Sequence, residues 1–215
     1  MKNLIKRILY IILFPFFNCR VICFFQAAKN HICWKTASSK LAKIGKFSNV
    51  CTGFELRGAE YIEIGDYFSA GKSLNLQAWD SYGNEKFTPK LIIGNNVMLT
   101  DYVQISCIDR IVLGDNLLVG QNVYISDNSH GNADASAINV PPLERPLTSK
   151  GPVIIGENVW IGRNSTILSG VTIGNNAIIG ANSVVTRDVP ENCVVAGSPA
   201  KPIKYLSDEV LRKDC

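Results

Sequence analysis

The chain of 215 residues has 47% hydrophobic and 19% charged residues, which predicts one folded domain with a sizeable core and excludes a disordered polyelectrolyte. Its formal net charge of +4 is unevenly distributed, because residues 1–54 contain nine Lys or Arg and no acid. The remaining 13 of the 22 basic residues stand against all 18 acids. The basic character therefore belongs to the N-terminus, and we expect no nucleic-acid partner.

Seven cysteines are scattered along the chain. Their number is odd, and they show neither the paired spacing of a zinc site nor the density of a secreted disulfide scaffold. We therefore expect reduced thiols, a cytoplasmic location and no required metal.

The N-terminal segment, residues 1–43, begins with an apolar run at residues 8–17 behind Lys6 and Arg7, and the run resumes at residues 21–25. A membrane span needs roughly 20 apolar residues, and the segment has no Ala-x-Ala cleavage site of a secretory signal. It predicts a helical anchor that lies on the inner face of the cytoplasmic membrane, with its cations near anionic lipid. The alternative is an amphipathic helix packed on the rest of the chain or on a neighbouring subunit.

From residue 44 to residue 189, aliphatic residues recur six apart in triplets. The six triplets are Ile44, Val50, Leu56; Ile64, Ala70, Leu76; Ile93, Leu99, Ile105; Leu113, Val119, Ile125; Ile155, Ile161, Ile167; and Ile173, Ile179, Val185. Neither a helix nor an alternating strand has this period. It predicts an all-β fold, a parallel β-helix of about six triangular coils with three six-residue sides each.

Gly and Asn recur beside the aliphatic residues. Asn stands three places after the aliphatic residue at seven positions: Asn96, Asn116, Asn122, Asn158, Asn164, Asn176 and Asn182. Both residue types tolerate positive φ, so we interpret them as corner residues of the coils and not as catalytic groups.

Residues 44–205 resemble the hexapeptide-repeat acyltransferase superfamily, and residues 126–204 are most similar to bacterial polysaccharide O-acetyltransferases and to galactoside and maltose acetyltransferases. The resemblance implies a left-handed β-helix, an exception to the usual right-handed crossover. It also implies acetyl-CoA as donor substrate and a homotrimer with sites between subunits.

The largest interruption of the period is the segment 126–152, which is polar and rich in turn residues. We expect it to leave the solenoid as a projecting loop, where functional residues are often found. Its His130 can remove a proton from an attacking hydroxyl near neutral pH. By the resemblance, His130 falls where similar acetyltransferases place their catalytic base.

Two neighbours of this histidine are candidates for acceptor binding. Asp127 and Asn128 could orient the acceptor or the base, or could shape the loop as Asx-turn residues. Many similar enzymes read Asp-His-x-His-Gly here, so Asn128 replaces their first histidine. A second departure is Thr100, near the place of the acceptor-binding Asn of the galactoside enzymes. Trp160 could line the acceptor pocket, or pack against the loop or another subunit.

The donor site is predicted from the resemblance alone. The places that contact the coenzyme in the galactoside enzymes fall on Arg163, Ala181, Thr186, Arg187, Lys201 and Lys204. The cations suit phosphate oxygens, although solvated surface charge is the alternative for each lysine. Residues 190–215 are expected to leave the solenoid and to end in a short helix from Ser207 to Lys213, with acids first and cations last.

These features predict an acetyl-CoA-dependent O-acetyltransferase that acts on a sugar hydroxyl, for bacterial surface polysaccharide such as O-antigen, capsule or exopolysaccharide. The alternatives are an acetyltransferase of a small molecule or free sugar, and a β-helix scaffold without catalysis. A carbonic anhydrase of this scaffold would need three zinc-binding histidines, and the chain has two.

Overall fold

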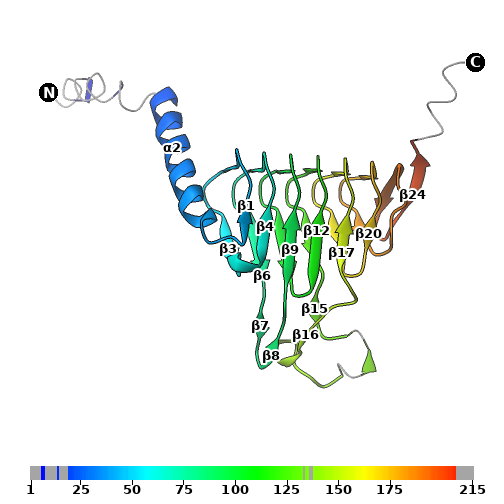
Figure 1. Ribbon diagram of the computed structural model, residues 1–215. Helices are drawn as coiled ribbons and strands as arrows, with labels where there is room; N and C mark the ends of the chain where they lie inside the picture. The colour runs from blue at the N-terminus through cyan, green and yellow to red at the C-terminus, as the bar shows by residue number, and fades with distance from the viewer. Residues whose placement is uncertain (1–5, 8–13, 15–18, 133, 136–137, 207–215) are drawn as a thin grey trace, which may run out of the picture.

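The computed structural model describes residues 6–7, 14, 19–132, 134–135 and 138–206. Its body is a parallel β-helix in which three sheets form the sides of a triangular prism (Figure 1). The predicted all-β, left-handed β-helix is confirmed. Helix α2 (Cys19–Ser38) stands at the N-terminal end of the solenoid.

Two of the three sheets contain one strand from each successive coil. The first sheet contains β1 (Lys43–Ile44), β4 (Ile62–Ile64), β9 (Lys90–Ile93), β12 (Arg110–Leu113), β17 (Val153–Ile155) and β20 (Thr172–Ile173). The second contains β2 (Asn49–Val50), β5 (Ser69–Ala70), β10 (Met98–Leu99), β13 (Leu118–Val119), β18 (Trp160–Ile161), β21 (Ile178–Ile179), β23 (Cys193–Gly197) and β24 (Ala200–Tyr205).

The third sheet carries the candidate site on its outer face. It contains β3 (Glu55–Arg57), β6 (Asn75–Ala78), β11 (Gln104–Cys107), β14 (Tyr124–Ser126), β19 (Thr166–Ile167) and β22 (Val184–Val185). Equivalent aliphatic residues pair between coils, as Ile105 does with Leu76 and Ile125. All three are fully buried, so the period of six marks one continuous core, in which each large aliphatic side chain contributes about 1.5–3 kcal/mol.

The corners have the conformation that their residue types predict. All seven of the predicted asparagines have positive φ, between 54° and 60°. Their side chains also form ladders along the prism: the Asn158 amide donates to Asn176 Oδ1 at 3.2 Å, and the Asn164 amide donates to Asn182 Oδ1 at 2.9 Å. The corner interpretation of these asparagines is confirmed.

Helix α2 closes the N-terminal end of the core through one tryptophan. Trp34 is 2% exposed and its ring contacts Phe54 and Phe68. Its indole N–H donates to Ser48 Oγ at 2.8 Å. The last turns of α2 therefore pack on the solenoid, as in the alternative considered for the N-terminal segment.

The outer part of α2 has a different character. Exposed apolar side chains along it include Ile22, Phe24, Phe25 and Ile32. Within the described ranges, no helix is both long enough and apolar enough to cross a membrane. Most of the predicted anchor, in residues 1–18, lies outside the described residues.

The C-terminal residues continue the solenoid further than expected. Strand β23 pairs in parallel with β21, so it adds to the second sheet, and β24 returns antiparallel to it. The expected departure from the solenoid at residue 190 is therefore wrong, because Cys193 and Val195 supply further buried side chains. The predicted short helix at residues 207–213 lies outside the described residues.

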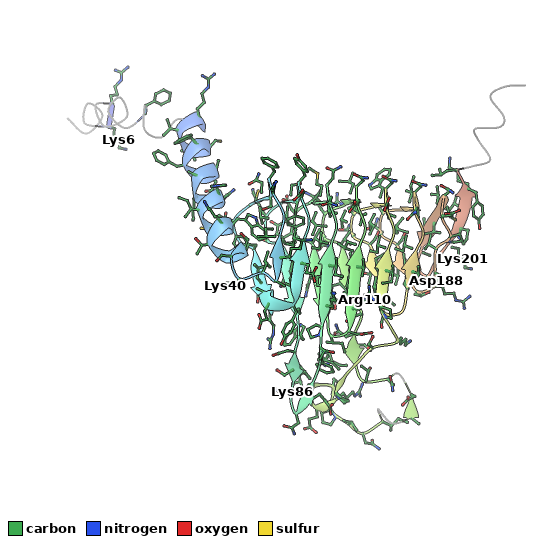
Figure 2. The ribbon with its side chains drawn as sticks, in the orientation of Figure 1. Lys6, Lys40, Lys86, Arg110, Asp188 and Lys201 are labelled. Carbon is green, nitrogen blue, oxygen red and sulfur yellow. The ribbon has the colours of Figure 1, made fainter. Side chains whose placement is uncertain are left out.

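Two segments project from the same edge of the prism, between the third and first sheets. One is a hairpin of β7 (Ser81–Tyr82) and β8 (Glu85–Lys86), and Lys86 marks it in Figure 2. The other is the predicted loop, residues 126–152, which contains β15 (Ser129–His130), η3 (Pro142–Glu144) and β16 (Leu147–Thr148). A short 3₁₀ helix, η1 (Ala59–Tyr61), occupies this edge in the first coil. The hairpin and the loop extend below the body in Figure 1, so the expected projection of the loop is confirmed.

Candidate active site

A cavity of about 240 Å³ lies between the two projecting segments, over the outer face of the third sheet. Its floor consists of side chains that alternate with the core residues of β6, β11 and β14, namely Gln77, Gln104, Ser106 and Tyr124. Its walls are Trp79 and Tyr82 from the hairpin, and Asn128, Ser129, His130 and Leu147 from the loop. The cavity therefore draws on three neighbouring coils and both insertions.

The root of the loop is held by a buried carboxylate. Asp127 is 0% exposed, and its two oxygens accept hydrogen bonds from the backbone N–H groups of Ile108 and Asp109, both at 2.9 Å. Ser169 Oγ donates to the backbone oxygen of Asp127 at 2.8 Å. Of the two roles open for Asp127, the geometry supports the loop-shaping one, because the carboxylate has no exposed surface to offer an acceptor.

The thiol of Cys107 lies in the same buried surroundings. Burial, and then the negative charge of Asp127, raise the pKa of this thiol far above its ordinary value of 9.0. A nucleophilic cysteine needs the opposite shift. Cys107 is therefore a packing residue of the core and not a second reactive group.

Asn128 ties the loop to the middle of the third sheet. Its side-chain nitrogen donates to the backbone oxygen of Ser106 at 3.0 Å and to Ser106 Oγ at 3.1 Å. Its backbone N–H donates to Ser126 Oγ at 3.1 Å, and that hydroxyl donates back to the Asn128 oxygen at 3.0 Å. These bonds hold Asn128 half-buried at the cavity wall, two residues before His130.

His130 lies in β15, opposite Leu147 of β16 in an antiparallel pair. Its imidazole is exposed and lines the cavity. The ring of Tyr82 contacts it edge to face, with centroids 5.2 Å apart and planes at 69°. Tyr82 also donates from its hydroxyl to the backbone oxygen of Leu143, at 3.5 Å. The hairpin and the loop thus meet at the imidazole.

The hairpin is the part of the site that sequence reasoning missed. Its signal is the 29-residue spacing from Ile64 to Ile93, against 20 residues for the neighbouring coils. Trp79, at the root of the hairpin, has the guanidinium of Arg57 3.4 Å from its ring centroid. Its indole N–H donates to Gln77 Oε1 at 3.2 Å. The contacts order an aromatic side chain at the cavity wall.

The remaining acceptor candidate, Trp160, and the departing position Thr100 lie elsewhere in the protomer. Trp160 is 51% exposed on the outer face of the second sheet, where it pairs with Leu118 of the preceding coil. Thr100 follows β10 in the same sheet and donates to the backbone oxygen of Val119 at 2.9 Å. Neither residue lines the cavity of His130, so the structure does not bring them together within one protomer.

The six donor candidates are all exposed and lie on the last coils. Arg163 and Ala181 occupy equivalent corners between the second and third sheets, where the Asn182 N–H donates to the Arg163 oxygen at 2.9 Å. Thr186 and Arg187 follow β22 of the third sheet. The two remaining candidates, Lys201 and Lys204, lie on β24, and Figure 2 shows Lys201 at the end of the solenoid opposite α2.

Among the residues that the structure describes, no group of three or more His, Cys, Asp or Glu side chains is arranged to hold a metal ion. The cavity itself offers an imidazole surrounded by amide, hydroxyl and aromatic groups. Such a histidine can accept a proton from a bound hydroxyl.

Comparisons with known proteins place this solenoid in a class of transferases. The family model "Bacterial transferase hexapeptide (six repeats)" matches residues 152–187. The Escherichia coli K12 protein named "Putative lipopolysaccharide biosynthesis O-acetyl transferase WbbJ" is 39% identical over 158 residues, which are 72% of this chain and 76% of the relative.

Two solved structures have a similar fold. A galactoside acetyltransferase in complex with coenzyme A is 25% identical, with a TM-score of 0.53 over 84% of this chain and 74% of that one. A maltose O-acetyltransferase from Clostridium difficile 630 is 29% identical, with a TM-score of 0.52 over 80% and 74%. The chain belongs to the hexapeptide-repeat acetyltransferase family, and it is an acetyltransferase.

Proposed function

We propose that this acetyltransferase transfers the acetyl group of acetyl-CoA to a sugar hydroxyl, in the biosynthesis of a bacterial surface polysaccharide. The observation that carries the proposal is the position of His130 in a cavity of uncharged hydrogen-bonding groups. The similarity to the WbbJ protein and to galactoside and maltose acetyltransferases supports a sugar acceptor.

The reaction follows from the placement of the imidazole. A neutral His130 takes the proton of the sugar hydroxyl as its oxygen attacks the thioester carbonyl carbon. A backbone N–H stabilises the resulting oxyanion. The C–S bond then breaks, the ester forms, and the CoA thiolate receives the proton from the imidazolium. Atoms and charges balance without a covalent enzyme intermediate or a metal.

The donor is proposed to bind along the last coils, where Arg187, Lys201 and Lys204 would meet phosphate oxygens. Arg187 follows β22 of the third sheet, whereas Lys201 and Lys204 lie on β24 of the second sheet. This separation within one protomer fits a groove shared by two subunits. A homotrimer is supported by a row of exposed apolar side chains on the second sheet. The row runs over successive coils and consists of Met98, Leu118 and Trp160. In a trimer, Trp160 could then face the acceptor site of a neighbour.

The location proposed for the enzyme is the cytoplasm, with peripheral contact to the inner face of the cytoplasmic membrane. The support is the exposed Phe24 and Phe25 of α2 together with Arg20 and Lys29 on the same helix. Apolar side chains beside cations suit the headgroup region of an anionic bilayer. Such a location favours a lipid-linked glycan as acceptor.

His130→Ala tests the catalytic role. We expect kcat for acetyl transfer to fall about 10²–10⁴-fold, the usual contribution of a general base, with acetyl-CoA still raising the melting temperature. His31→Ala is the matched control, because His31 is the other histidine and lies exposed on α2. Normal transfer by folded His130→Ala protein would show the assignment to be wrong.

The acceptor is tested in cells. NMR of the surface polysaccharide should lose an O-acetyl signal when the gene is deleted, and the wild-type gene but not His130→Ala should restore it. An identical acetyl pattern would argue against the glycan proposal. If the protein neither binds acetyl-CoA nor releases free CoA thiol from it, the result would instead favour the β-helix scaffold without catalysis.

A further inference from the structure

The hairpin β7–β8 leaves the solenoid two coils before the loop that carries His130, yet the two segments contact each other. Tyr82 supplies the contact through its ring and its hydroxyl. The hairpin therefore contributes Trp79 and Tyr82 to the wall of the cavity that contains the imidazole. The family repeat does not require this insertion, because a coil can turn this edge without one, as residues 168–171 do between β19 and β20.

The floor beneath this wall is prepared for hydrogen bonding. Gln77 uses its side-chain oxygen to accept from the Trp79 indole. Within the described part of the chain, its side-chain nitrogen has no protein partner, and the same holds for both polar atoms of the Gln104 amide. Primary amides that face a cavity in this way can donate to and accept from hydroxyl groups.

The chemistry of the lining selects a class of ligand. The described residues that line the cavity include no carboxylate, ammonium or guanidinium group, so none of them offers a fixed positive charge to a phosphate or a carboxylate. Aromatic rings beside amides and hydroxyls suit a pyranose, which has an apolar C–H face and a polar rim of hydroxyls. A volume of about 240 Å³ lies below the roughly 300–1,000 Å³ of pockets for drug-sized ligands, which indicates one sugar ring.

We propose that the hairpin completes an acceptor subsite for one uncharged pyranose ring, which packs against Trp79 and Tyr82, bonds to Gln77 and Gln104, and presents a hydroxyl to His130. This inference rests on the proposed sugar acetyltransferase activity and names the part of the acceptor that the site recognises. Arg57 acts as a positioning residue, because its guanidinium covers the Trp79 ring.

The first measurement is binding, which does not depend on catalysis. Saturation-transfer NMR is applied to the full-length protein with methyl galactoside, methyl glucoside and methyl glucuronide at equal concentrations. The neutral glycosides should receive saturation through their ring C–H groups and the charged glucuronide should not. The absence of binding by every neutral glycoside, or preference for the glucuronide, would overturn the inference.

The variants Tyr82→Ala and Trp79→Ala should weaken the saturation signal and raise the KM for the neutral glycoside about 10-fold, as loss of an aromatic contact of roughly 1.4 kcal/mol predicts. The KM for acetyl-CoA should stay within about twofold. Tyr82→Phe keeps the ring and should retain most of the binding. Tyr67→Ala is the matched control, since Tyr67 is an exposed aromatic residue at another corner of the same coil.

The outcomes separate this inference from the proposed function. Unchanged sugar binding in folded Tyr82→Ala and Trp79→Ala proteins, or a change in the KM for acetyl-CoA alone, would show that the hairpin does not hold the acceptor. Binding that needs both aromatic residues, without acetyl transfer to any glycoside, would uphold the subsite and refute the proposed reaction. Trp79→Phe replaces Trp79→Ala if the smaller side chain lowers the yield of folded protein.

Discussion

Replacing Asp127 removes the acceptor of two backbone donors at the root of the projecting loop. The N–H groups of Ile108 and Asp109 each donate to this carboxylate at 2.9 Å, and the side chain is fully buried. A buried donor left without a partner costs about 1–3 kcal/mol. Asp127→Ala should therefore lower the free energy of unfolding by about 2–6 kcal/mol. Asp127→Asn keeps one acceptor oxygen and should cost about half as much.

The measurement is urea or thermal unfolding at one fixed protein concentration, since subunit association also contributes to stability. For a chain of this size, 2 kcal/mol corresponds to a melting temperature lower by roughly 4–8 °C. Asp109→Asn is the matched control, because Asp109 is an exposed acid beside the same turn, and it should change stability by less than about 0.5 kcal/mol. Equal stability of Asp127→Ala and Asp109→Asn would refute the reasoning.

Three further outcomes are expected. Trp34→Ala should lower the free energy of unfolding by about 3–5 kcal/mol and expose α2 to protease, because Trp34 is 2% exposed. An unchanged unfolding midpoint would contradict the role of Trp34 in closing the end of the core. Asn164→Ala should lower the free energy of unfolding by about 1–2 kcal/mol more than Asn164→Gly, because Asn164 has a φ of 57°. Equal stabilities of the two variants would show that alanine is not strained at this corner. The unfolded chain releases the Cys107 proton near pH 9 whereas the folded chain retains it, so stability should fall as the pH rises above about 9, by up to about 1.4 kcal/mol per pH unit. The pH slope of Cys107→Ala should be smaller, and an identical slope would rule out this thiol as the cause.

The period of six was sufficient to predict the solenoid because every repeat places one aliphatic side chain that must be buried. Aliphatic residues spaced six apart, such as Ile161, are all buried at once only in the interior of stacked coils. The Asn corners report the backbone directly, since Asn tolerates the positive φ that most residues avoid. The long insertion at 126–152 follows from the same count, because 24 extra residues cannot stay within a coil.

The structures at the two ends of the solenoid depend on tertiary packing. The apolar run that ends at Phe25 indicated a helix but not its attachment, which comes from Trp34, nine residues further on. At the other end, Pro190 interrupts the pattern of six, so the continuation of the second sheet through β23 could not be read from spacing.

The sequence by itself determined the repeat, its corners and the projecting loop, since each is a local property of residue type and spacing. Its resemblance to known acetyltransferases marked His130 as the candidate base. The role of His130 stays a prediction until the variants are measured. Only the tertiary structure placed Trp79 and Tyr82 at the imidazole, buried the Asp127 carboxylate, and set Trp160 on another face. The physical reason is that residues from different coils become neighbours only when the chain stacks, and the direction in which an insertion leans depends on contacts such as that of Tyr82 with His130.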